Sequence, residues 1–136
     1  MDIKIADEIF EALKYYNKKI GSPYGNVVVP YPTTKPTYPY CVFDEINNIE
    51  NPQSRSDFDR VSTIGYKLEI YAKTKGCIDN RTIARDIAQK LNSFLTRNVG
   101  LRQVGFVPVP QVNQSSIYQI TITYIGKLHE NRKTIY

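Results

Sequence analysis

Residues 61–95 read VSTIGYKLEIYAKTKGCIDNRTIARDIAQKLNSFL, and this stretch decides the fold. In its first half, residues 61–73, every second residue is apolar, which predicts a half-buried strand. The apolar positions of this strand are Ile64, Tyr66, Leu68, Ile70 and Ala72, and the intervening ones are Gly65, Lys67, Glu69, Tyr71 and Lys73. In the second half the apolar spacing changes to three and four residues, which predicts an amphipathic helix.

This predicted helix has clear boundaries. Asp79 or Asn80 can cap its beginning, and Asn98 and Gly100 favour its end. Its apolar stripe consists of Ile83, Ala84, Ile87, Ala88, Leu91, Phe94 and Leu95. The sequence thus places a strand with one buried face directly before a helix with one buried face.

A second amphipathic helix is predicted at the N-terminus, with Asp2 as its cap. Its apolar residues are Ile5, Ala6, Ile9, Phe10, Leu13, Tyr16 and Ile20. Acidic residues are placed early and lysines late, as the helix dipole favours, and Gly21–Pro23 cannot continue the helix.

The chain between this helix and the central strand is rich in proline. Residues 25–39 read GNVVVPYPTTKPTYP, which predicts a short edge strand at 26–29 and then an extended, polyproline-like passage. In residues 40–46, apolar residues occur at both odd and even positions, which predicts a strand that is covered on both faces or enters an interface. The polar residues 47–60 predict an extended loop at the tip of a long hairpin.

Two more strands are expected downstream, at residues 101–107 and 116–127, with 108–115 as their connection. Residues 128–136 are polar and basic and are expected to form a C-terminal arm. The order helix, short strand, hairpin, helix, hairpin predicts an α+β fold. We expect a single, mainly antiparallel sheet with two helices packed on one face, in one domain spanning residues 1–136.

The composition is that of a soluble globular domain, with 41% hydrophobic and 23% charged residues. No apolar run approaches the roughly 20 residues of a membrane span. The first ten residues, MDIKIADEIF, do not resemble a signal peptide, so we expect synthesis in the cytosol. Cys41 and Cys77 have no neighbours at metal-ligand spacing and are expected to be buried, reduced thiols rather than a disulfide.

The search for chemistry yields no catalytic, cofactor-binding or metal-binding residues. His129 is expected to be solvated in the polar tail, and the adjacent Asp44 and Glu45 point to opposite faces of a strand. Asp57 and Asp59 are expected to be solvated or ion-paired rather than metal ligands. No glycine-rich phosphate loop is present.

Nucleic-acid binding is an alternative, because the chain has 11 tyrosines and a net charge of +5. However, Tyr66, Tyr118 and Tyr124 share strand faces with isoleucines, which favours a core position over a stacking platform. Assembly is the stronger expectation, because an open sheet exposes unpaired edges that can pair with another subunit, and head-to-tail pairing closes a ring.

The whole layout resembles the tail terminator proteins of long-tailed bacteriophages, also called tail completion or head–tail joining proteins. The resemblance rests on the N-terminal helix, the passage VVVPYPTTKPTYPYCVF, the polar loop and the strand VSTIGYKLEIYAKT. It continues with the helix RTIARDIAQKLNSFL and the closing segments GLRQVGFVPVP and SSIYQITITYIGKL.

The resemblance implies a non-enzymatic structural protein of the virion, assembled in the host cytoplasm, that forms a hexameric ring at the head-proximal end of the tail. Such a ring stops tail polymerisation and offers the surface on which the filled head docks. Its implied partners are the tail tube protein, a head-completion or connector protein, and DNA that passes through the lumen without sequence-specific binding. The alternative is another phage connector, head-completion or tube component. The candidate interface or lumen residues are Arg55, Asp57, Asp59, Arg60, Lys127, Arg132, Lys133 and Tyr136.

Overall fold

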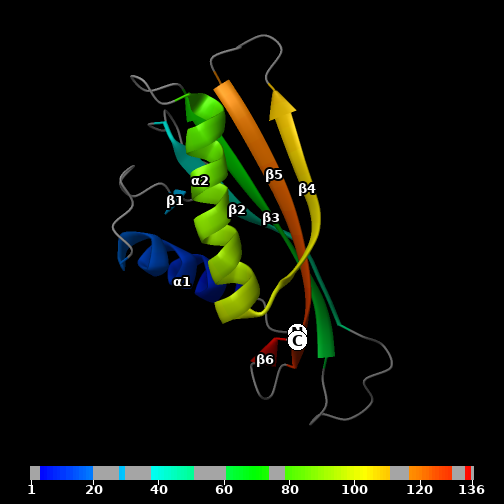
Figure 1. The fold of residues 1–136 in the computed structure, drawn as a ribbon. Helices are drawn as coiled ribbons and strands as arrows, with labels where there is room; N and C mark the ends of the chain where they lie inside the picture. The colour runs from blue at the N-terminus through cyan, green and yellow to red at the C-terminus, as the bar shows by residue number, and fades with distance from the viewer. Residues whose placement is uncertain are drawn as a thin grey trace.

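The computed structural model describes residues 4–19, 28–29, 38–50, 61–73, 79–110, 117–129 and 134–135. Within them, two helices lie on one face of a six-stranded sheet (Figure 1). The helices are α1 (Ile5–Lys19) and α2 (Asn80–Ser93), and a π-helical segment (Phe94–Val99) continues α2. The strands are β1 (Val28–Val29), β2 (Tyr40–Glu50), β3 (Val61–Lys73), β4 (Arg102–Pro110), β5 (Ile117–His129) and β6 (Thr134–Ile135). The predicted α+β fold is confirmed.

The sheet is open and has two unlike ends. Its strand order is β1-β2-β3-β5-β4, with β6 added beside β5. The pairs β2–β3, β3–β5 and β4–β5 are antiparallel, and only β1 runs parallel to its neighbour β2. The predicted edge strand near residues 26–29 is β1, although it is only two residues long.

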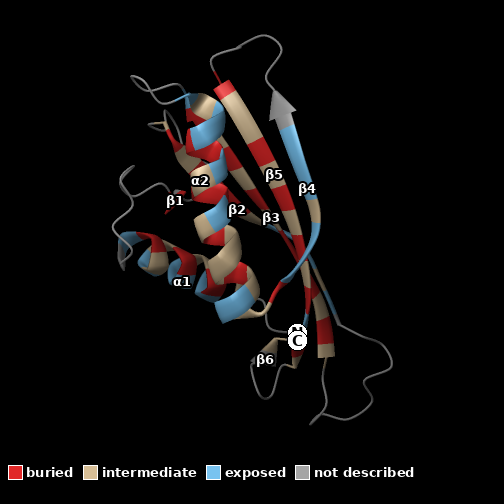
Figure 2. Cartoon of the chain, in the orientation of Figure 1, coloured by how far each residue is buried: buried red, intermediate tan, exposed pale blue. Residues whose placement is uncertain are grey.

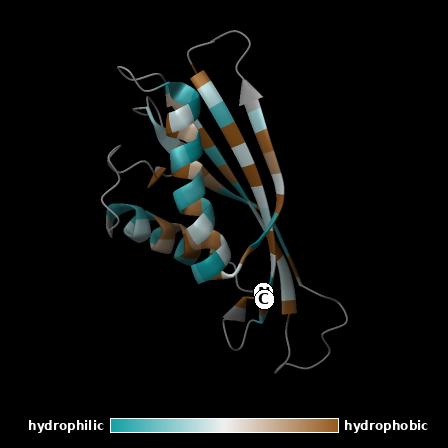
Figure 3. Ribbon diagram, in the orientation of Figure 1, coloured by the Kyte–Doolittle hydropathy of each residue, from teal (hydrophilic) through white to brown (hydrophobic). Residues whose placement is uncertain are grey.

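The core lies between the helices and the face of the sheet that they cover. The predicted alternation in β3 is confirmed, because Ile64, Tyr66, Leu68, Ile70 and Ala72 are all fully buried. Figure 2 shows the buried residues of α2 turned toward the sheet, and Figure 3 shows alternating hydropathy along β3 and β5. Each fully buried aliphatic side chain contributes about 1.5–3 kcal/mol to the free energy of folding. The two-residue period therefore identified the core face of the sheet.

Local hydrogen bonds and one glycine define the two ends of α2 and its π-helical continuation. Asp79 is the N-cap, and its Oδ1 accepts a hydrogen bond from the backbone N–H of Thr82 at 2.7 Å. At the other end, the Thr96 hydroxyl donates to the Asn92 carbonyl at 2.9 Å, within the turn where the helix widens into the π-helical segment. Gly100, with φ of 93°, ends the segment, as the sequence predicted.

Three strands run past the ends that the sequence predicted, and two of them, β2 and β4, continue into predicted loops. β2 continues through residues 47–50, so the first four residues of the predicted loop 47–60 belong to the strand. The pairing with β3 shifts its register between Glu45 and Asn47 and then continues through residues 47–50. β4 likewise includes Pro108–Pro110, which were predicted as loop; prolines are tolerated there because β4 is an edge strand.

The C-terminal prediction was also partly wrong. β5 continues through His129, and β6 folds back on it, with Leu128 opposite Ile135 and His129 opposite Thr134. These residues of the expected arm, 128–129 and 134–135, are part of the sheet. His129 is half-buried at the end of β5 rather than solvated in a tail.

Cys41 is fully buried and not in a disulfide, as expected, and burial raises the pKa of its thiol. Cys77 lies outside the described residues. In the part of the chain that the structure covers, neither helix is long and apolar enough to span a membrane.

Candidate assembly surfaces

The outer side of β4 exposes more apolar surface than a solvated edge requires. Val104, Phe106 and Val107 are 52%, 40% and 54% exposed, and no described strand pairs with this side of β4. Figure 2 shows most of the strand in the colour of exposed residues. Val104 lies in the register shift between Gln103 and Gly105. Apolar side chains on an unpaired edge are typical of a surface that another chain covers.

Cations flank these apolar side chains on both faces of the sheet. On the helix face, the Arg85 guanidinium of α2 lies 5.9 Å from the centre of the Phe106 ring. Arg81, one helical turn earlier, is exposed on the same face of α2. On the other face, Arg102 is exposed at the start of β4. We call Val104, Phe106 and Val107, with Arg81, Arg85 and Arg102, the β4 edge.

A hollow separates α2 from β4 beside this edge. It has a volume of about 260 Å³ and is lined by Arg85, Ala88, Gln89, Asn92, Gln103, Phe106 and Ile122. The hollow is open because helix α2 covers the middle of the sheet, on β3 and β5, and does not reach over its last strand.

The opposite end of the sheet has acidic residues beside exposed apolar ones. β1 pairs with β2 only at Cys41 and Val42, so the outer side of residues 43–50 has no strand partner among the described residues. Ile46 and Ile49 in this stretch are 50% and 58% exposed. Asp44, Glu45 and the α1 residue Asp7 complete what we call the β2 edge.

The electrostatic environment at the β2 edge disfavours another negative charge. Partial desolvation raises the pKa of Glu45, and the nearby carboxylates of Asp7 and Asp44 raise it further. Glu45 is opposite Tyr66 on the helix face of the sheet, whereas Asp44 is opposite Lys67 on the other face. The sequence prediction that Asp44 and Glu45 point to opposite faces is confirmed. A cation brought to this edge would relieve the repulsion.

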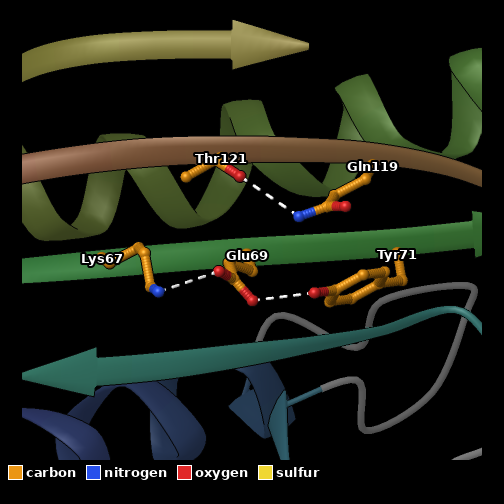
Figure 4. Close-up of polar contacts among 5 residues, drawn as sticks. All are labelled: Lys67, Glu69, Tyr71, Gln119 and Thr121. Atoms are coloured by element: carbon orange, nitrogen blue, oxygen red, sulfur yellow. Dashed lines mark hydrogen bonds and ion pairs between the residues drawn. The ribbon is translucent and has the colours of Figure 1, made fainter. Parts of the chain in front are cut away.

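The face of the sheet away from the helices is polar and hydrogen-bonded within itself. Figure 4 shows the Lys67 ammonium 3.0 Å from Glu69, whose other oxygen accepts a hydrogen bond from the Tyr71 hydroxyl at 2.8 Å. On β5, the Gln119 amide donates to the Thr121 hydroxyl at 3.3 Å. Burial and the bond to Glu69 raise the pKa of Tyr71.

This open face also has a tyrosine cluster that sequence reasoning did not identify. The Tyr40 and Tyr71 rings are stacked at 4.9 Å, Tyr38 lies 5.2 Å from Tyr40, and the Lys73 ammonium lies 4.5 Å from the centre of the Tyr38 ring. In the sequence, Tyr71 alternates with the apolar residues of β3 in the same way as Lys67 and Lys73, and this pattern could have placed it on the open face. By contrast, Tyr66 and Tyr124 are fully buried, as predicted.

Of the predicted interface residues, the structure describes Lys127. It is exposed on the open face of β5, beside a hollow of about 350 Å³ lined by Thr63, Arg102, Ile125, Gly126 and Lys127. The other seven lie outside the described residues: Arg55, Asp57, Asp59, Arg60, Arg132, Lys133 and Tyr136. The surfaces that the structure does reveal, the β2 and β4 edges, were expected only in general terms, as open sheet edges.

Within the described ranges, no group of three or more histidine, cysteine or carboxylate side chains is arranged to hold a metal ion. The sequence matches no protein-family model and no curated protein.

Proposed function

We propose that this protein is a structural component of the bacteriophage tail, a ring-forming tail terminator that caps the tail tube and provides the surface on which the head joins. The observation that carries the proposal is the exposed apolar side of β4, an edge strand long enough to pair with another chain. The resemblance of the layout to tail terminators supports the same role. In this role the chain is not an enzyme.

The proposal places the protein in the virion, at the head-proximal end of the tail. Its partners are further copies of itself in a hexameric ring, the tail tube protein below and a head-completion or connector protein above. DNA passes through the lumen without sequence-specific contacts. The polar open face, with its charges already paired within the sheet at Lys67 and Glu69, suits a surface that does not hold DNA.

Tube capping tests the proposal. Tail tubes of the phage that encodes this chain are grown from tube protein, with and without the purified chain, and are imaged by negative-stain electron microscopy. A terminator stops growth and leaves a ring at one end of each tube. Tubes that lengthen by incorporating the chain would show a tube component, and binding to heads alone would show a head-completion protein.

Nucleic-acid binding is a second candidate, favoured by the cluster of Tyr38, Tyr40 and Tyr71 beside Lys73. Two observations weaken it. The Tyr40 and Tyr71 rings stack on each other, which occupies one face of each. The Glu69 carboxylate, bonded to Tyr71, places a negative charge where a phosphate would approach. Measured affinity for single-stranded DNA that falls steeply with salt, and falls again in Lys73→Ala, would favour this candidate.

A further inference from the structure

We propose that the β4 edge of one copy and the β2 edge of the next are the two halves of one head-to-tail interface between copies of this chain. The partner is therefore a second copy, and the contact extends the sheet from one copy into the next. The closure of such contacts into a ring rests on the function proposed above, but the contact itself is argued from the two edges alone.

Among the described residues, the open and the closed stretches of the two edges match in level to within one residue. The registers place Pro108 opposite Ile120, Ile120 opposite Ile70, and Ile70 opposite Cys41, where β1 begins to pair through Val28. At this level β4 cannot donate, because proline lacks an N–H, and the outer side of β2 is already occupied. When a second copy is placed beside the first along the sheet, the part of its β2 that is covered by β1 therefore lies next to the proline-containing part of β4 in the first copy.

The open stretches coincide in the same way. The registers place Gly105 level with Asp44, through Thr123 and Lys67. The same registers place residues 102–106 of β4 level with residues 43–47 of β2, which have no strand partner on their outer side among the described residues. Val107 lies level with Val42, the last residue that pairs with β1. In the described part of each edge, this stretch has no strand partner on its outer side and has exposed apolar side chains in or next to it.

Strand direction is also compatible. Because neighbours β2–β3, β3–β5 and β5–β4 are all antiparallel, β4 runs opposite to β2. A copy placed beside the first in the same orientation therefore brings β4 antiparallel to the next β2. The antiparallel pattern of the sheet would continue across the contact without a break.

Charge is complementary on both faces. On the helix face, Arg85 would meet the side that holds the two carboxylates of Glu45 and Asp7, which lie close enough to repel each other. On the open face, the registers place Arg102 level with Asn47 and diagonally across from Asp44, a distance that a long arginine side chain can span. Pairing β4 with β4, or β2 with β2, instead brings like charges together. The edges thus favour a contact between unlike surfaces over a two-fold symmetric one.

Three variants test this arrangement. Variant A, Val104→Glu/Val107→Glu, introduces carboxylates only on the β4 edge. Variant B, Ile46→Glu/Ile49→Glu, introduces them only on the β2 edge. All four side chains are at least half exposed, so the fold is retained. The control is Tyr15→Glu, which changes an apolar side chain that is 68% exposed but lies in neither edge.

Native mass spectrometry and analytical ultracentrifugation measure association. We expect A and B alone to self-associate about a hundredfold more weakly than the wild type and the control, from roughly 1.4 kcal/mol lost per side chain. A mixture of A and B retains one intact β2 edge and one intact β4 edge, so it forms a dimer of one A and one B that grows no further. Unimpaired association of A or B, or a mixture that stays monomeric, overturns the proposal.

Weak association is captured by cross-linking. In a Cys77→Ser background, Gly105→Cys and Asp44→Cys chains are mixed at high concentration with a short bis-maleimide. A Cβ at Gly105 meets only Thr123, at 3.7 Å, so this position accepts a side chain. We expect a product joining the two chains, absent when both carry variant A; its absence with the intact edges overturns the proposal.

The two proposals fail separately. Chains that associate as described but do not cap tubes refute the tail-terminator function and leave the interface standing. Chains that cap tubes equally well with both edges spoiled refute the interface alone.

Discussion

Removing the hydroxyl of Tyr124 and removing the side chain of Asn92 break the same hydrogen bond, yet they should reduce stability by different amounts. The Tyr124 hydroxyl donates to Asn92 Oδ1 at 2.8 Å and joins β5 to α2. Tyr124 is fully buried, whereas Asn92 is half-buried and lines the hollow between α2 and β4. Water can therefore replace the partner of Asn92 more readily than the partner of Tyr124.

The magnitudes follow from this asymmetry. In Tyr124→Phe, the Asn92 oxygen is hydrated from the hollow, and we expect a loss of about 1 kcal/mol, the net value of one hydrogen bond. For a chain of 136 residues this lowers the melting temperature by about 4 °C. In Asn92→Ala, the buried hydroxyl is left without its acceptor. The desolvation penalty, less about 0.5 kcal/mol gained in helix propensity, gives a loss of about 2 kcal/mol.

A double-mutant cycle in urea makes the test sharp. Once Tyr124 is phenylalanine, no hydroxyl remains to be orphaned, so Asn92→Ala should become neutral or slightly stabilising. Tyr15→Phe, on an exposed side chain, is the control and should change nothing. If Asn92→Ala reduces stability equally in both backgrounds, the hydrogen bond does not couple the helix to the sheet and our reasoning is wrong.

Three further outcomes are expected. Gly100→Ala forces a side chain into the left-handed region and should lower the free energy of unfolding by about 1–2 kcal/mol, whereas Gly105→Ala should have little effect; equal urea midpoints would contradict this. With Cys77→Ser, the buried Cys41 thiol, whose pKa is raised, should react with iodoacetamide only on unfolding, and rapid native labelling would show that it is accessible. The raised pKa of Glu45 means that the folded chain binds this proton more tightly than the unfolded chain, so stability falls as the pH rises through the carboxyl range. Glu45→Gln should therefore raise the melting temperature more at pH 7 than at pH 3, and an equal rise at both would show that folding does not raise the pKa of Glu45.

The sequence predicted the parts of the fold that depend on periodic burial. The alternation in residues 61–73 and the stripe on α2 arise because one face of each element packs against the core, and both were identified correctly. Asp79, one of the two predicted candidates, is the cap, and the end at Gly100 was also correct, because capping depends on local backbone geometry.

Strand ends were predicted less well, because they depend on the neighbouring strand rather than on local composition. Residues 47–50 look like a loop but pair with β3 after a register shift, and Pro108–Pro110 look like a break but lie on an edge that does not need their N–H groups. The tyrosine cluster was missed for a similar reason: Tyr40 and Tyr71 meet only through the pairing of two strands. Cross-strand register was not available from the sequence pattern.

The same dependence on neighbours explains why the two edges are best interpreted together. A protein that only needed to avoid aggregation could have closed the whole of β4 with prolines or charged side chains, as natural edge strands often are. Here the prolines close one part, while Val104, Phe106 and Val107 leave the other part apolar. The opposite edge is closed by β1 within one residue of that level, and beyond β1 it has no strand partner among the described residues. Protection that stops within one residue of the same height on two edges, separated by the whole sheet, has a simple explanation if those heights meet in an assembly, because both edges are then shaped by one contact.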